Sequence, residues 1–111
     1  MHTRILLALS IALSTQAHAD VRPKAWCGFY ARHNLVTHDP GIAYNLASNW
    51  RHYGRPSPVP CLNCMVVFNH HVGKIVGPCH GYNCVITSGN DGGAVRTRER
   101  SVAGAEFRII P

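Results

Sequence analysis

The residue best suited to do chemistry in this chain is Cys27, in the run AWCGFY at residues 25–30. The chain has five cysteines, and the other four form two pairs that are close in sequence: Cys61 with Cys64, and Cys79 with Cys84. An odd cysteine in an exported protein indicates either an intermolecular bond or a free, reactive thiol. Because a thiolate is a strong nucleophile, the pattern predicts that Cys27 is a catalytic nucleophile.

The local sequence around Cys27 is compatible with a reactive thiol. The apolar spacing predicts a helix over residues 24–38, so Cys27 falls close to its start, just after Pro23. The positive end of the helix dipole and the free backbone N–H groups there would favour a thiolate. Gly28 would let another backbone or a substrate approach closely. The alternative, a buried structural cysteine, fits the residue type equally well.

A base for this thiol must come from another part of the chain, and the adjacent histidines His70 and His71 are candidates. Side chains alternate along a strand, so only one of the two can face Cys27, and we expect it to be His71. A third polar group usually orients the imidazole of such a pair, and Asn90 ends the next predicted strand. The alternatives are a structural histidine and an asparagine that serves only its turn.

The four remaining cysteines allow three interpretations. Disulfides are favoured because they persist in exported proteins and because a hairpin turn at residues 80–83 would bring its two flanking cysteines within bridging distance. The spacing Cys-x2-Cys-x14-Cys-x4-Cys is also close to that of a zinc ribbon, with histidines nearby as further ligands. The third interpretation is a redox-active pair of Cys61 and Cys64. In the favoured interpretation the protein needs no metal and no cofactor.

The first nineteen residues, 1–19, resemble a signal peptide. A positively charged start is followed by an apolar run over residues 5–13 and by the small-x-small motif at residues 17–19. The apolar run is shorter than the roughly 20 residues that cross a bilayer. We therefore expect a periplasmic or secreted protein without a membrane anchor after cleavage, and a single domain over residues 20–111.

Within that domain the pattern predicts two helices followed by about five strands. The helices span residues 24–38 and 42–53, and in the second Ile42, Leu46 and Trp50 are expected to stack on one face. Residues 54–60 contain three prolines and form an extended connector. The predicted strands, separated by turn residues, are 65–68, 71–76, 84–87, 94–97 and 107–110. This order is typical of an α+β domain with an antiparallel sheet.

The chain is basic, with 11 Lys and Arg against 5 Asp and Glu and a formal net charge of +6. Arg96, Arg98 and Arg100 alternate along a predicted strand and therefore share one face, which is either a solvated surface or a contact for an anionic polymer. No basic groove interleaved with aromatic residues is evident, so a nucleic-acid partner is not expected.

The order of these motifs resembles that of the CHAP/NlpC-type cysteine amidases and peptidases, over residues 25–111. It consists of Trp-Cys-Gly at a helix start, a second helix with Ala and Trp, a proline-rich link, Val-Val-Phe, His-Val-Gly, Gly-Asn and a last strand that ends in proline. The resemblance implies a papain-like α+β fold, with two N-terminal helices packed on an antiparallel sheet of about five strands. It also implies that Cys27 is the nucleophile, His71 the base and Asn90 the group that orients the imidazole.

The same resemblance implies the activity: hydrolysis of amide bonds in peptidoglycan or other cell-wall peptides. The chain departs from the family pattern at residues 62–64, where Leu-Asn-Cys replaces the usual Pro-Gly-Asp, and in its two added cysteine pairs. These departures leave two alternatives open. One is an exported module of the zinc-ribbon type, and the other is a catalytically inactive module that binds the cell wall.

Overall fold

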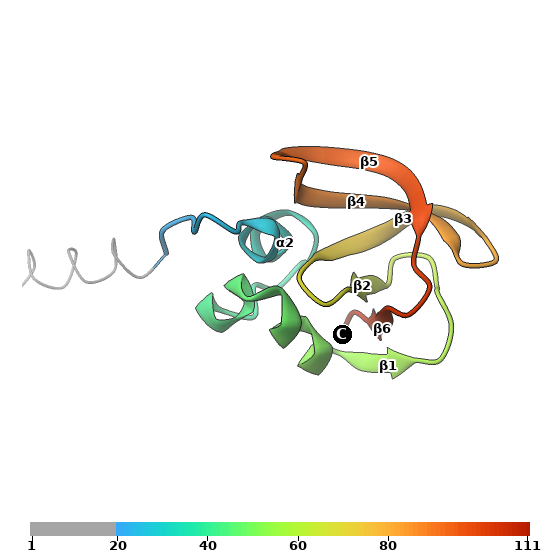
Figure 1. Cartoon of the computed structure of the whole chain (residues 1–111). Helices are drawn as coiled ribbons and strands as arrows, with labels where there is room; N and C mark the ends of the chain where they lie inside the picture. The colour runs from blue at the N-terminus through green and yellow to red at the C-terminus, as the bar shows by residue number, and fades with distance from the viewer. Residues whose placement is uncertain (1–19) are drawn as a thin grey trace, which may run out of the picture.

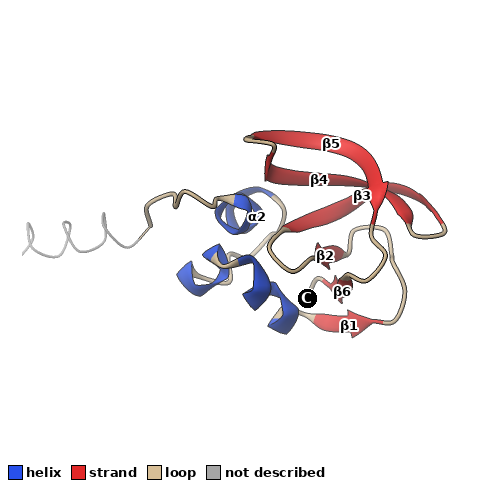
Figure 2. Cartoon of the chain, viewed as in Figure 1, coloured by secondary structure: helices blue, strands red, loops and turns tan. Residues whose placement is uncertain are grey.

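The computed structural model describes residues 20–111, so the predicted signal peptide lies outside the described residues. Most of the described chain is one antiparallel sheet of six strands, accompanied by one α-helix and two short 3-10 helices (Figure 1). Figure 2 shows that the helices all precede the strands along the chain, and that they gather on one side of the sheet. None of the helices in residues 20–111 is long and apolar enough to cross a membrane.

The helical elements are α2 (Cys27–Asn34), η1 (Ile42–Asn45) and η2 (Ala47–His52). The strands are β1 (Arg55–Ser57), β2 (Met65–Val67), β3 (Val72–His80), β4 (Asn83–Asp91), β5 (Ala94–Ser101) and β6 (Glu106–Ile109). Their order in the sheet is β1-β6-β2-β3-β4-β5. Successive strands β3, β4 and β5 are joined by tight turns, and the last of these turns uses Gly92 and Gly93 at positive φ, as two-residue hairpin loops require.

The prediction of a papain-like domain with two helices packed on five strands is wrong. The segment expected to be the second α-helix is two 3-10 helices, because its hydrogen bonds run from residue i to i−3, as from the Tyr44 amide to the Gly41 carbonyl. Leu46 separates them with extended backbone at φ −80° and ψ 118°. The side-chain amide of Asn49 donates to the Ala43 carbonyl and so supplies a bond that a longer helix would have made with backbone.

The expected apolar stack on that segment is also absent. Trp50 is 0% exposed and its indole N–H donates to the Tyr44 carbonyl at 2.7 Å. Ile42 and Leu46, by contrast, are 46% and 60% exposed. A 3-10 helix turns every three residues rather than every 3.6, so side chains four apart no longer share a face.

The first helix is shorter than the predicted range 24–38. After Leu35 the chain turns back, and the segment that follows is tied to the helix by Arg32. The buried guanidinium of Arg32 bonds the carboxylates of Asp20 and Asp39 and the side-chain oxygen of Asn45, each at 2.8 Å. The hydrogen bond from Arg32 is the main reason that the pKa of Asp39 falls to about 2.

The one strand that was not predicted, β1, lies in the proline-rich connector. Its extended conformation was predicted, but not its pairing with the last strand of the chain: β1 aligns Pro56 with Arg108 of β6. Arg108 reinforces this junction by donating to the carbonyls of Tyr53 and Gly54. Pro56 is tolerated because β1 is an outer strand with one neighbour only.

The core has two parts, one on each face of the sheet. The helix-side cluster joins α2 and η2 to β2 and β3, and comprises Cys27, Ala31, Leu35, Ala47, Trp50, Tyr53, Met65, Val67 and Val72. The opposite cluster comprises Val66, Ile75, Cys84, Ile86, Val102 and Phe107. The alternation of side chains along β2 separates the two, since Val66 and Val67 belong to different clusters.

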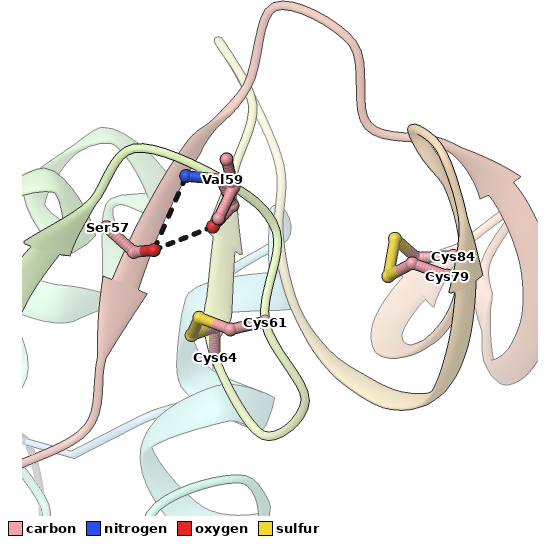
Figure 3. Close-up of a disulfide and its surroundings, with 6 residues drawn as sticks. All are labelled: Ser57, Val59, Cys61, Cys64, Cys79 and Cys84. Atoms are coloured by element: carbon pink, nitrogen blue, oxygen red, sulfur yellow. Dashed lines mark hydrogen bonds between the residues drawn. A yellow bond between two sulfur atoms is a disulfide. The ribbon is translucent and has the colours of Figure 1, made fainter.

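Two disulfides staple the domain, as the favoured interpretation of the cysteines predicted. Cys61–Cys64 closes the turn before β2, and Cys79–Cys84 joins directly opposed positions of the β3–β4 hairpin, with Cα atoms 4.0 Å apart (Figure 3). The two bridges lie in different parts of the domain, and their sulfurs, once oxidised, are not available as zinc ligands. In residues 20–111 no group of three or more His, Cys, Asp and Glu side chains is arranged to hold a metal ion.

Candidate functional site

Cys27 is the first residue of α2 and the only free cysteine of the chain. It is 4% exposed and belongs to the helix-side cluster. The next residue, Gly28, fits directly against the backbone carbonyls of Tyr44 and Asn45, where a Cβ atom has no room. Glycine therefore allows η1 to pack against the first turn of the helix, and this contact holds the thiol in place.

A small cavity of about 150 Å³ opens beside Cys27. Its wall is formed by the residue preceding α2, by the junction of η1 with η2, and by the turn before β3: Ala25, Cys27, Asn45, Leu46, Ala47, Ser48, Asn69 and His70. Four of these eight side chains are small: Ala25, Cys27, Ala47 and Ser48. The cavity therefore has room for a peptide bond with a small substituent, next to the sulfur.

His71 lies immediately before β3, beside Phe68, with ring centroids 6.1 Å apart. Its Nε2 atom is buried and has no hydrogen-bond partner. Burial is the main cause that lowers the pKa of His71, Arg100 lowers it further, and Asp91 works in the opposite direction. The imidazole is therefore neutral at pH 7, the protonation state that a general base needs.

Asn90 lies near the end of β4, next to the start of β3. The antiparallel register of β3 with β4 pairs Lys74 with Thr87, so the end of β4 lies beside the start of β3. Asn90 has a positive φ of 53°, a conformation that asparagine tolerates better than most residues. This is also where the pairing of β4 with β5 shifts register, between Ser88 and Asp91.

The first turn of α2 packs against this same end of the sheet. A Cβ atom on Gly89 would collide with the side chains of Tyr30 and Trp26, so the glycine allows the helix to sit directly on β4. Val72, the residue after His71, contacts the cluster that contains Cys27. The first turn of α2 therefore lies against the start of β3 and the end of β4, but His71 lines a cavity together with Phe68 and Ala105, which pack against the opposite cluster.

The structure does not join all three by hydrogen bonds, because Nε2 of His71 has no partner. It places His70, rather than His71, in the wall of the cavity beside Cys27. His71 lines a neighbouring cavity of about 470 Å³, and the two cavities share Asn69 and His70. Sequence reasoning did not identify Asn69 or its shared position. The only sequence signal for Asn69 was the polar run Asn-His-His at residues 69–71, which follows a buried strand.

The alternating arginines of β5 do share one face, but two of the three bond to Asp91. Arg98 makes a two-pronged ion pair with Asp91, at 2.7 and 2.9 Å, which lowers the pKa of that carboxyl group. Arg96 donates to the backbone carbonyl of Asp91 at 2.6 Å. Two of the three therefore hold the β4–β5 hairpin close to the site.

The half-buried imidazole of His71 predicts a pH dependence of stability. The pKa of His71 is lower in the folded protein than the roughly 6.5 of an exposed histidine, so the unfolded chain binds the proton first as the pH falls. The contribution of His71 to stability should thus be complete above about pH 6.5 and decline below it. Urea unfolding between pH 7.5 and 5 measures this decline.

The matched controls for this titration are two glutamine variants. His71→Gln should flatten the dependence on pH, whereas His70→Gln, at an exposed neighbouring position, should keep it. An unchanged slope in His71→Gln would contradict the assignment of the acid sensitivity to this buried ring.

Comparisons of this chain with protein-family models, with curated proteins and with solved structures find no match. Its function therefore has to be argued from the site itself. That site comprises a free thiol at a helix start, an imidazole whose Nε2 has no partner, an asparagine near the end of the neighbouring strand β4, and two cavities that meet at His70.

Proposed function

We propose that this protein is an exported cysteine amidase or endopeptidase that hydrolyses amide bonds in peptidoglycan peptides. Cys27 is the nucleophile, His71 the general base and Asn90 the residue that orients the imidazole. One observation carries the proposal: the free thiol lies at the helix start that packs on the same end of the sheet as the half-buried imidazole of His71, whose buried Nε2 has no partner. The resemblance of the motif order to CHAP/NlpC-type enzymes supports the same assignment.

The proposed reaction assigns one role to each of these groups. His71 removes the thiol proton as the sulfur of Cys27 attacks the carbonyl carbon, and it returns the proton to the leaving amine. A water molecule, deprotonated by the same imidazole, then hydrolyses the thioester and releases the acid. The backbone N–H of Cys27, at the start of α2, would stabilise the negative oxygen of the intermediate. Catalytic hydrogen bonds are often long in a free enzyme and shorten when substrate binds, so the missing bond at Nε2 is compatible with this role.

The positive charge of the chain suits an anionic wall polymer. With a formal net charge of +6, the protein would be attracted to such a surface at low ionic strength, and salt would weaken the attraction. The disulfides fit an oxidising compartment outside the cytoplasm, which supports a periplasmic or secreted location.

The proposal is tested by labelling the thiol and by searching for product. Alkylation of the non-reduced protein with iodoacetamide, followed by peptide mapping, should give one label per chain, on Cys27. Incubation with purified peptidoglycan should release new amino termini or soluble peptides detectable by mass spectrometry, and Cys27→Ala should release none. Labelling elsewhere, or equal release by Cys27→Ala, would refute the role of this residue.

A second candidate function is a wall-binding module without catalysis. It is favoured by one observation: His70 rather than His71 lines the cavity beside the thiol, and Nε2 of His71 bonds nothing. Co-sedimentation with purified peptidoglycan distinguishes the two functions. Wild-type protein that sediments with the wall but releases no peptide, and that sediments equally well as Cys27→Ala, would support the binding module over the enzyme.

A further inference from the structure

Arg100 differs from the other two arginines on its face of β5. Arg96 and Arg98 both bond to Asp91, through its carbonyl oxygen and its carboxylate respectively. The guanidinium of Arg100 instead lies over the ring of Phe68, with its central carbon 4.5 Å from the ring centroid. Within residues 20–111 it has no carboxylate partner, so its N–H groups are free to bind a ligand.

Phe68, beneath Arg100, forms part of the wall of the cavity of about 470 Å³ that also includes His71. The opposite wall is the turn at residues 103–105, which carries only small side chains. The charge of Arg100 is close enough to His71 to lower the pKa of that imidazole. The cavity therefore has an apolar wall at Phe68, and over that ring lies a cation without a carboxylate partner, near the proposed base.

The roles of the two cavities follow from the proposed mechanism. Cys27 lines the smaller cavity and would carry the acyl part of the substrate, whereas His71 lines the larger one and would protonate the leaving amine. The larger cavity is thus on the leaving-group side of the scissile bond. A guanidinium stacked on an aromatic ring keeps the N–H groups at its edge free, and their planar arrangement matches the two oxygens of a carboxylate.

We infer that Arg100, supported by Phe68, binds a carboxylate on the leaving-group side of the substrate peptide. This inference rests on the proposed function, whose site it deepens. Asp91 does not compete for Arg100 because its carboxylate is already bound by Arg98. Of the remaining acidic residues nearby on the strand, Glu99 alternates to the other face of β5.

Binding without turnover tests the subsite. In a Cys27→Ala background, the Kd is measured for soluble muropeptides with free carboxylates and for the same muropeptides after conversion of their carboxylates to carboxamides. The carboxylate form should bind about ten- to a hundredfold more tightly, as expected for hydrogen bonds to a charged group. Arg100→Gln should abolish this preference, and Arg100→Lys, which keeps the charge but loses the planar fork, should retain only part of it.

The matched control is Arg96→Gln, which removes the same charge from the same face of β5 but not from the cavity. It should keep the preference for carboxylate. Equal binding of both muropeptide forms by the Cys27→Ala protein, or an unchanged preference in folded Arg100→Gln, would overturn the inference even if wild-type protein cleaves peptidoglycan. A preference that depends on Arg100 in a protein that cleaves nothing would sustain the subsite and refute the proposed hydrolysis.

Discussion

Replacement of His71 by alanine should lower kcat/KM for amide hydrolysis by about 10²–10⁴-fold, the usual contribution of a general acid–base group. The expected loss is large because His71 both activates the thiol of Cys27 and protonates the leaving amine. Burial lowers the pKa of His71, so the imidazole is unprotonated and ready to accept a proton at neutral pH. The rate of peptide release from purified peptidoglycan provides the measurement, with Cys27→Ala as the background.

His70→Ala is the matched control for this experiment. His70 is adjacent in sequence, exposed, and part of the cavity wall beside Cys27, so it shares the surroundings of the site without being buried in it. We expect His70→Ala to keep kcat/KM within a few-fold of wild type, a change well below the general-base effect. A severe loss in His70→Ala with a mild one in His71→Ala would transfer the role of base to His70.

Replacement of Trp50 by alanine should destabilise the fold by about 3–5 kcal/mol, the range for large aromatic residues removed from a core. Trp50 is 0% exposed, and its ring packs against Tyr44 and Tyr53 at centroid distances of 5.2 and 4.8 Å. The substitution also removes the indole N–H that donates to the Tyr44 carbonyl. A loss of this size is a large share of the roughly 5–15 kcal/mol that stabilises a typical domain. Urea unfolding followed by far-UV circular dichroism measures it.

Two further variants separate the causes of that loss. Trp50→Phe keeps most of the ring but removes the N–H donor, so it should cost clearly less than Trp50→Ala. Leu46→Ala, at a position 60% exposed, should change stability by less than about 0.5 kcal/mol. If Leu46→Ala were as damaging as Trp50→Ala, the two side chains would share a buried face, as an α-helix over residues 42–53 would require.

Local signals predicted those parts of the fold that depend on neighbouring residues. The β-rich runs and the Gly-rich turns located the start of each of β2 to β6 to within one residue, because turn chemistry acts over short distances, but β3, β4 and β5 each run four residues beyond the predicted end. The bridge between Cys79 and Cys84 followed from the hairpin that they flank. The pairing of β1 with β6 joins segments about fifty residues apart and left no such local signal.

The error at residues 42–53 has a physical origin. Apolar residues at Ile42, Leu46 and Trp50 have the spacing of an α-helix, but the backbone there is decided by tertiary contacts. Trp50 is fully buried, and its indole N–H donates to the Tyr44 carbonyl. Gly28 packs directly against the carbonyls of residues 44 and 45. Tertiary packing of this kind routinely overrides a helical pattern.

The candidate site was predictable only in part for the same reason. The position of Cys27 at a helix start depends on local sequence and is confirmed, since Cys27 is the first residue of α2. Which of His70 and His71 turns toward the thiol depends on the turn at residues 68–71, which lies before the strand. Strict alternation does not apply there, and the structure divides the two histidines between adjoining cavities.

The two outer strands of the sheet also affect how copies of this protein meet in solution. One of them, β1, is only three residues long and carries Pro56, which cannot donate a ladder hydrogen bond. The other, β5, is long and largely exposed, but it carries three arginines within eight residues. A second copy that added a strand to this sheet would lack a hydrogen-bond donor at Pro56 on the β1 edge and would face like charges on the β5 edge. The domain is thereby protected against strand-by-strand aggregation, even though its fold is mostly one open sheet.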